Sequence, residues 1–184
     1  YTGPVKRIHE GSAPDIKNKS FSISADVVLP KGNEQGVLVT QGGLSGGFAL
    51  VFEKGKPVFY YNMANVAHYS VAAGQALKPG KHTIVLDFLY DGGGIGKGGT
   101  GTLSVDGTQV AQGRIGNTVP FRFSIDETFD VGEDTGTAVD LSYDVPFKFT
   151  GTIDKLVIKY LSGTKLSAVD QQKVNAVEAE IKAD

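Results

Sequence analysis

The chain has 184 residues, no cysteine and a formal net charge of −2 at pH 7. The lack of cysteine excludes disulfides, thiolate metal sites and cysteine nucleophiles, and the balanced charge gives no basic surface for nucleic acid or an acidic membrane. No apolar run approaches the ~20 residues of a membrane span, and the 25 glycines follow no Gly-X-Y repeat, which excludes a collagen-like chain.

The first twenty residues are polar and have no apolar core like that of a signal peptide. We interpret residues 1–20 as an extended arm or linker. The chain starts with Tyr1 and its only methionine is Met63, so we expect it to be a piece of a larger protein.

From residue 21 onward apolar and polar residues alternate, which is typical of strands with one buried face. The clearest strand covers 21–29, where Phe21, Ile23 and Leu29 share one face. Further short strands are expected at 37–40, 48–52, 58–62, 69–72, 83–90, 102–105, 121–125, 147–149 and 153–161.

Glycine-rich segments separate these strands. We expect loops at 41–47 and 91–101, and the Asp106-Gly107 dipeptide suits a type I′ hairpin turn, which needs positive φ at both residues. Many short strands with glycine turns between them predict an antiparallel arrangement.

Only the tail, 162–184, has helical spacing. Ser167 is a suitable N-cap, and the expected apolar stripe consists of Leu166, Val174, Val177 and Ile181. The sequence therefore predicts an all-β fold, a two-sheet antiparallel β-sandwich over 21–161, followed by one C-terminal α-helix.

Three motifs have catalytic or nucleotide-binding counterparts, but each lacks either the expected structural context or a required residue. Residues 94–99 match G-x-G-x-x-G but lead into a strand, so no helix N-terminus would face a phosphate. Ser45 lies in a G-x-S-x-G match that also precedes a strand, whereas a nucleophile elbow precedes a helix. His9-Glu10 lacks the second histidine of H-E-x-x-H. We expect no catalytic centre in this chain, and a hydrolase acting through Ser45 is the less favoured alternative.

An acidic segment lies between Arg122 and Lys148, where neither lysine nor arginine occurs. Carboxylates among glycines suit Ca²⁺, although the EF-hand pattern fails because Val131 stands where glycine is required. The candidate metal ligands are Asp126, Glu127, Asp130, Glu133 and Asp134. The interpretation that we favour is that 126–144 is a docking loop for another domain, which would use Asp126, Asp130, Glu133, Asp134, Asp140 and Asp144; a solvated loop is the remaining alternative.

A second candidate site is aromatic. Tyr60, Tyr61 and Tyr69 could form a platform on which a sugar stacks. Aromatic residues in strands are more often part of the core, so a core position is the competing interpretation.

Two levels of resemblance follow from these residues. Strands 81–88 and 102–107 resemble the paired inner strands of concanavalin A-like jelly rolls, the class that includes lectins, glucanases and laminin-G-like domains. Longer segments resemble the C-terminal domain of large bacterial arylsulfatases: RIHEGSAPDIKNKSFSI (7–23), LDFLYDGGGIGKGGTGTLSVDG (86–107), VPFRFSIDETFDVGEDTG (119–136) and VPFKFTGTIDKLVIKY (145–160). This resemblance covers about residues 5–160.

The resemblance implies a longer polypeptide in which another domain carries the catalytic centre. In that family an N-terminal α/β domain hydrolyses sulfate esters with a Ca²⁺ ion and a formylglycine made within a C/S-x-P-x-R motif. Here residues 12–16 lack the arginine and residues 118–122 begin with threonine, so no catalytic or cofactor-binding residue is carried over. The Ca²⁺ and the formylglycine would belong to the parent enzyme.

We therefore expect a non-catalytic C-terminal accessory domain that packs on the N-terminal catalytic domain of the same polypeptide, absent from this chain, and helps to shape it. The alternative is a lectin-like carbohydrate-binding module, with a glycan partner and possible dependence on Ca²⁺. Of the compartments compatible with a cysteine-free chain, we favour the periplasm or secretion over the cytoplasm.

Overall fold

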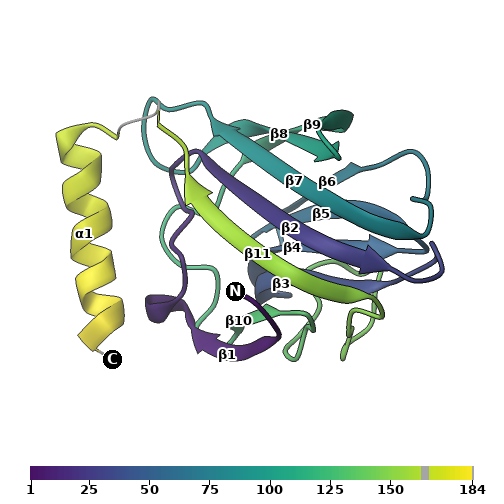
Figure 1. The fold of residues 1–184 in the computed structure, drawn as a ribbon. Coiled ribbons are helices and arrows are strands. Elements are labelled where there is room, and N and C mark those ends of the chain that lie inside the picture. The colour runs from purple at the N-terminus through teal and green to yellow at the C-terminus, as the bar shows by residue number, and fades with distance from the viewer. Residues whose placement is uncertain (163–165, 184) are drawn as a thin grey trace.

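The computed structural model describes residues 1–162 and 166–183. Within these residues, eleven strands form two antiparallel sheets that pack face to face (Figure 1). The strands are β1 (Val5–His9), β2 (Phe21–Leu29), β3 (Gly36–Gly43), β4 (Gly46–Glu53), β5 (Lys56–Met63), β6 (Ala67–Ala72), β7 (Gly80–Tyr90), β8 (Lys97–Val105), β9 (Thr108–Asn117), β10 (Thr128–Val131) and β11 (Thr152–Tyr160). A 3-10 turn, η1 (Glu10–Ser12), follows β1, and the helix α1 (Ala168–Ala183) ends the chain.

The strand order is β1-β10-β3-β4-β5-β6 in the six-stranded sheet and β11-β2-β7-β8-β9 in the five-stranded sheet. This confirms the predicted all-β, two-sheet antiparallel sandwich with one C-terminal helix. In β2 burial alternates at every residue, and Phe21 and Ile23 lie opposite Phe88 and Leu86 of β7. The alternation read from the sequence therefore reflects one face of each strand turned towards the other sheet.

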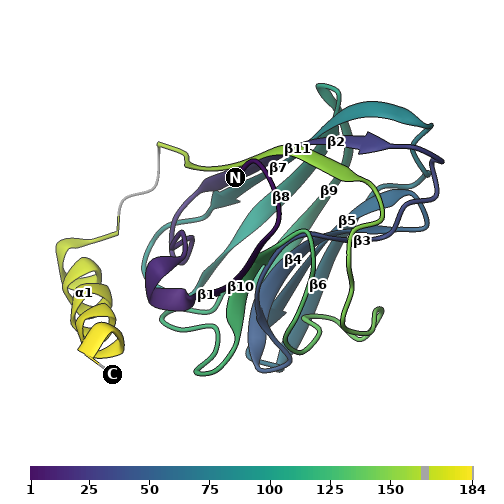
Figure 2. The ribbon, with the colours of Figure 1, turned by 60° about the horizontal axis from the view of Figure 1, so that its bottom comes forward.

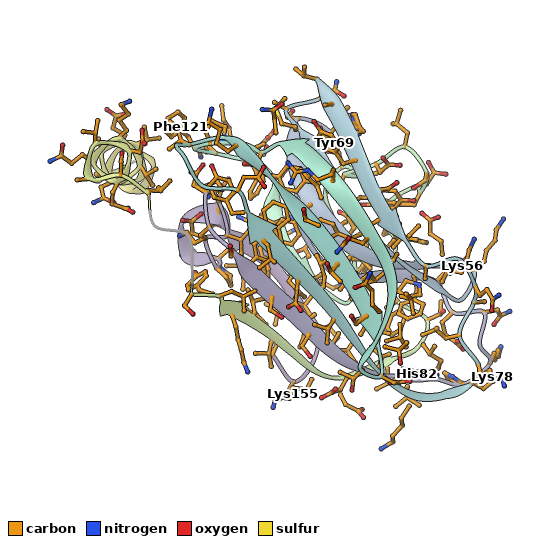
Figure 3. The ribbon with its side chains drawn as sticks, turned by 90° about the horizontal axis from the view of Figure 1, so that it is seen from above. Lys56, Tyr69, Lys78, His82, Phe121 and Lys155 are labelled. Carbon is orange, nitrogen blue, oxygen red and sulfur yellow. The ribbon has the colours of Figure 1, made fainter. Side chains whose placement is uncertain are left out.

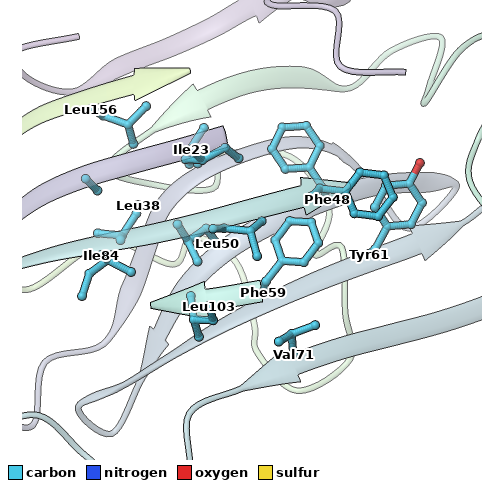
Figure 4. Packing of buried hydrophobic residues seen from close by; sticks show 14 of the residues in the cluster. Ile23, Leu38, Phe48, Leu50, Phe59, Tyr61, Val71, Ile84, Leu103 and Leu156 are labelled. Carbon is cyan, nitrogen blue, oxygen red and sulfur yellow. The ribbon is translucent and has the colours of Figure 1, made fainter. Parts of the chain in front are cut away.

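The main core fills the space between the sheets (Figure 4). Phe48, Leu50 and Phe59 project from the six-stranded sheet towards Ile23 and Leu103 of the five-stranded sheet. All five side chains are fully buried, so this layer supplies most of the apolar burial that drives folding.

A second apolar layer covers the outer face of the six-stranded sheet. Segment 132–149 crosses this face, and its Val139 and Tyr143 pack on side chains of β3, β4 and β5, including Val51 and Tyr60. Both faces of β4 are thus buried, which explains why residues 48–52 are apolar without a polar alternation.

The N-terminal arm belongs to the sandwich rather than extending away from it. β1 pairs with β10 in the six-stranded sheet, and Tyr1 exchanges two backbone hydrogen bonds with Leu156 of β11. Ile16 is buried in the main core. Residues 1–20 therefore contact both sheets, and the ordered unit begins before residue 21.

Both predicted glycine loops are shorter than the sequence suggested. β3 and β4 extend to a two-residue turn at Leu44 and Ser45, and β8 already begins at Lys97. The glycines serve close packing: a Cβ atom on Gly99 would lie 2.3 Å from the ring of Phe88. The high glycine content of this part of the chain therefore reflects tight contacts within strands as well as turns.

Two predicted strands are irregular segments instead. Residues 121–125 and 147–149 alternate in sequence, but in the structure they form no strand. Phe123 inserts into the core, whereas Ile125 is 82% exposed. Phe147 packs against the second layer, whereas Phe149 is buried in the main core. Period-two alternation also arises in a loop that covers a sheet, and this caused the wrong prediction.

The tail forms a helix, as predicted. The Oγ atom of Ser167 accepts a hydrogen bond from the backbone N–H of Asp170 at 3.1 Å, which is the expected N-cap. Val174 is buried against the sandwich and Val177 is half-buried, while the side chain of Ile181 lies outside the described residues. In Figures 1 and 2, α1 stands beside the sandwich near β1 and η1. Among the described residues no helix is both long and apolar enough to cross a membrane.

Candidate functional site

The acidic segment is largely built into the sandwich. Asp130 is buried: one carboxylate oxygen accepts the backbone N–H of Arg7, and the other accepts both the N–H and the hydroxyl of Thr135. Arg7 has φ +58° at a bulge in β1, a conformation that is costly for a residue other than glycine. Asp130 therefore stabilises a strained bulge.

Asp134 is the second buried acid. It accepts hydrogen bonds from the hydroxyl of Tyr143 at 2.8 Å and from the N–H of Gly136 at 3.2 Å. Burial, which removes water from the charged form, is the main cause that raises the pKa of Asp134 to about 6, and the nearby Asp130 and Glu127 act in the same direction. The carboxyl group of Asp134 therefore joins two parts of segment 132–149 through hydrogen bonds in its buried interior.

Two further acids close turns at the start of the segment. Glu127 accepts hydrogen bonds from the N–H and the hydroxyl of Thr137, at 3.1 and 2.6 Å. Asp126 is exposed and accepts the hydroxyl of Ser124 at 3.0 Å. Both carboxylates thus have donors within the chain itself.

The remaining acids lie on the surface of the segment. Glu133 forms an ion pair with Lys6, and Asp140 lies 3.6 Å from a ring nitrogen of His68. Asp144 is exposed. Glu133 and Asp140 thus face different basic residues, one on β1 and the other on β6.

The structure does not bring the predicted metal ligands together. Within the described part of the chain, no group of three or more histidines, cysteines or acids is placed to hold a metal ion. The density of carboxylates in the sequence reflects internal hydrogen bonding in this segment rather than convergence on one point. The candidate ligands were Asp126, Glu127, Asp130, Glu133 and Asp134.

The predicted aromatic platform is not formed. Tyr60 and Tyr61 are successive residues of β5 and therefore point to opposite faces of the sheet. Tyr60 lies beneath segment 132–149, and Tyr61 lies in the main core, where its hydroxyl accepts the N–H of Val119. Tyr69 is half-buried and packs against the main core. These three rings do not share a surface on which a sugar could stack.

Ser45 occupies the exposed turn between β3 and β4. His68 is engaged by Asn65 at 3.2 Å, and His82 by Asp106 at 2.7 Å. His82 and Lys56 both lie at the end of the sandwich away from Phe121 (Figure 3). The expectation that this chain is not an enzyme stays a prediction.

One residue that the sequence reasoning missed organises an end of the sandwich. Asn62, fully buried at the end of β5, donates hydrogen bonds to the carbonyl groups of Gly43, Leu44 and Val139 and accepts the N–H of Asn65. It therefore joins the β3–β4 turn, the β5–β6 turn and segment 132–149. A lone asparagine that ends a strand of apolar residues is the signal that could have found it.

We call this part of the molecule the Asn62 end. Its turns expose three aliphatic side chains, with exposed fractions of 44% for Leu44, 79% for Val66 and 82% for Ile125. Ile125 belongs here because its neighbours Phe123 and Glu127 lie next to the glycines that flank the β3–β4 turn.

The loop that carries Ile125 is held by a buried ion cluster. The carboxylate of Glu10 accepts the N–H groups of Phe123 and Ser124 and pairs with Lys17 at 2.9 Å. Lys17 also pairs with Asp15 at 2.7 Å. Burial opposes ionisation of Asp15, but Lys17 and the nearby Lys19 outweigh it and hold the pKa of Asp15 at about 2. The apolar surface is therefore presented by a loop with fixed geometry.

A second surface feature lies at the other end of β5. It is a cavity of about 540 Å³, which we call the Lys54–Lys56 cavity because the β4–β5 turn forms one side. Segment 132–149 forms the other side. The cavity is lined by Gln35, Glu53, Lys54, Lys56, Ser142, Tyr143, Asp144 and Phe147.

Comparison with known proteins gives the fold but no family. No protein-family model matches the chain, and no curated protein matches it. Solved structures do match. Domains LG4-5 of the mouse laminin α1 chain align over 82% of this chain and 40% of that chain, with a TM-score of 0.60 and 12% sequence identity.

Two further structures are similar. The LG1-3 region of the laminin α2 chain has a TM-score of 0.57 and 13% identity over 85% of this chain and 29% of that chain. A structure of botulinum neurotoxin type C, described by the dependence of cell entry on two ganglioside molecules, has a TM-score of 0.54 and 12% identity over 86% of this chain and 36% of that chain. The chain thus spans less than half the length of these proteins, and its fold is a laminin-G-like, concanavalin A-like jelly roll.

Proposed function

We propose that this chain is a non-catalytic accessory module of a larger enzyme, and that the enzyme is an arylsulfatase, which hydrolyses sulfate esters. The sequence resemblance across about residues 5–160 supports the identity of the enzyme, while the similar structures named above include no sulfatase. The structural observation that carries the accessory role is the exposed apolar surface of the Asn62 end.

Single exposed aliphatic residues are ordinary on protein surfaces, whereas a group on neighbouring turns marks an interaction site. Leu44, Val66 and Ile125 form such a group, and Asn62 and Glu10 fix the turns that carry them. A surface fixed before contact loses little conformational entropy on docking. It therefore suits packing against a catalytic domain of the same polypeptide.

An apolar docking surface differs from the prediction that the acidic segment forms the docking loop. Asp130 and Asp134 are buried, and Glu133 and Asp140 have partners within the sandwich, so most of the acids fasten the segment. We propose that the contact with the catalytic domain is mainly apolar. The carboxylate of Asp126, next to Ile125, would lie at its rim.

The proposal is tested in a polypeptide that carries this module behind its catalytic domain. A variant with Leu44→Asp, Val66→Asp and Ile125→Asp should lower the melting temperature of the catalytic domain and reduce hydrolysis of an aryl sulfate several-fold. Leu89→Asp is the matched control, because Leu89 is 57% exposed on the five-stranded sheet. The proposal fails if the sequence upstream of Tyr1 holds no C/S-x-P-x-R segment, or if the triple variant behaves like the control.

A second candidate function is that of a lectin-like, glycan-binding module. It is favoured by the jelly-roll fold, by the ganglioside named for the similar neurotoxin, and by the Lys54–Lys56 cavity, which combines aromatic and polar side chains. A glycan array probed with the chain, in Ca²⁺ and in EDTA, tests it. Binding retained in EDTA would exclude a role for Ca²⁺, and silence across the array would reject the lectin-like function.

A further inference from the structure

An immobilised aromatic pair forms one wall of the Lys54–Lys56 cavity. The rings of Phe147 and Tyr143 stack with centroids 4.9 Å apart and planes inclined by 18°. Tyr143 is fixed by hydrogen bonds to Asp134 and Val139, and the carbonyl group of Phe147 accepts the N–H of Val37 at 3.2 Å. Phe147 is half-buried and lines the cavity. A ring fixed in this way can pack its negative face against the slightly positive C–H groups of a sugar.

Two lysines stand at the opposite wall without a counter-ion. Lys54 lies in the β4–β5 turn and Lys56 begins β5; within the described residues neither ammonium group has a carboxylate within 4 Å. This holds although Glu53 and Asp144 line the same cavity. Unpaired cations beside an aromatic wall favour a ligand that carries a negative group.

The cavity also holds groups for sugar hydroxyls. The Oε1 atom of Glu53 accepts the hydroxyl groups of Tyr60 and Ser142, each at 2.8 Å, so the carboxylate is held in one orientation. Its other oxygen and the amide of Gln35 are of the types that bond to hydroxyl groups in carbohydrate sites. The site thus combines a stacking face, two cations and fixed acceptors.

We propose that the Lys54–Lys56 cavity binds an acidic sugar, a pyranose with a sulfate or carboxylate substituent. The ring would lie on Phe147, and the anionic group would face Lys54 and Lys56. This inference rests on the lectin-like function and names its site and ligand class. Because the cavity and the Asn62 end lie at opposite ends of β5, docking and sugar binding could occur together.

The test is calorimetric titration of the chain with three oligosaccharides of equal length: a sulfated galactan, its desulfated form and an oligogalacturonate. The sulfated or the uronic ligand should bind at least about fivefold more tightly than the desulfated one, since each exposed ion pair contributes little in water. That preference should shrink as salt is raised, because salt screens exposed charges.

Variants then locate the site. Phe147→Leu keeps an apolar side chain but removes the ring, and should weaken every binding ligand about tenfold. Lys54→Gln and Lys56→Gln should each weaken the acidic ligand about threefold and leave the desulfated ligand unchanged. Lys155→Gln, an exposed lysine of β11 (Figure 3), is the control and should change nothing.

The outcomes separate the two proposals. If the chain binds none of the three ligands and none on the array, the lectin-like function fails and this inference fails with it. If the chain binds but the cavity variants bind like the parent, the lectin-like function stands and this site is overturned. An equal loss in Lys155→Gln would show a general charge effect and would also overturn the site. Melting curves establish that each variant is folded.

Discussion

The two sheets differ in what lies on their outer faces. On the six-stranded sheet, Val51 and Tyr60 are buried beneath segment 132–149. On the five-stranded sheet, outward-facing residues such as Ser24 and Asp87 remain half-exposed and polar. A covered sheet needs groups that hold the covering segment, and here Asp130 of β10 and Glu127 accept hydrogen bonds from Thr135 and Thr137 of segment 132–149. The difference shows that the carboxylates of an acidic segment can serve to hold a covering loop through internal hydrogen bonds.

The largest expected effect on stability concerns segment 132–149, which covers the six-stranded sheet. Tyr143→Ala removes a ring buried between the segment and the sheet, together with two hydrogen bonds within the segment, and should lower the free energy of unfolding by about 3–5 kcal/mol. Val85→Ala, on the open face, should cost no more than about 1 kcal/mol. Urea denaturation measures both, and equal losses would remove the distinction between the two faces.

The next effect concerns pH. The folded-state pKa of Asp134, about 6, lies above its unfolded value, so its contribution to stability is complete below about pH 4 and is lost as the pH rises through 6. Asp134→Asn should remove this fall, which amounts to roughly 2–3 kcal/mol between pH 4 and pH 8. Unfolding free energies at several pH values test the slope. Parallel curves for both proteins would contradict the raised pKa of Asp134.

A smaller effect concerns the inner face of the covered sheet. Gln41 of β3 is buried, and both polar atoms of its side chain lack a hydrogen-bond partner among the described residues. Gln41→Leu should therefore raise the free energy of unfolding by about 1 kcal/mol, because an unsatisfied buried amide is destabilising. A loss of stability in thermal melts would show that the amide has a structural role.

The smallest expected effect on stability concerns His82 of the five-stranded sheet. Both ring nitrogens of His82 face acceptors, Asp106 at 2.7 Å and the carbonyl group of Lys78 at 2.9 Å. Partial burial opposes protonation, but these acceptors outweigh it and raise the pKa of His82 above 6.5. The stabilising contribution is present below pH 6.5 and is lost as the pH rises through the folded-state pKa. His82→Gln should flatten this dependence, which NMR titration and melting curves can follow.

The sandwich could be predicted because the alternation in β2 and β7 records which side of each strand faces the other sheet. The covering of the six-stranded sheet by segment 132–149 could not be predicted. The burial of Tyr60 depends on Tyr143, more than eighty residues later, and no local pattern encodes that contact. The apolar run at 48–52, like those at 37–39 and 57–61, is the local trace of a sheet buried on both faces.

The candidate sites show the same limit. Composition identified the acidic segment but cannot tell that Asp134 faces a tyrosine hydroxyl inside the protein. The alternation of Phe147 with Phe149 predicts a strand. The stacking of Phe147 on Tyr143 depends instead on the path of an irregular segment, which the alternation does not encode. The Lys54–Lys56 cavity exists only where the end of that segment meets the β4–β5 turn, so it could not be found before the fold was known.

The backbone pairing of Tyr1 with Leu156 places the beginning of the described chain against its last strand. A polypeptide that enters at residue 1 and leaves after β11 therefore returns to the same flank of the jelly roll. Such a geometry allows the whole unit to be grafted into a surface loop of a host protein, or circularly permuted with a short peptide bridge, without breaking either sheet.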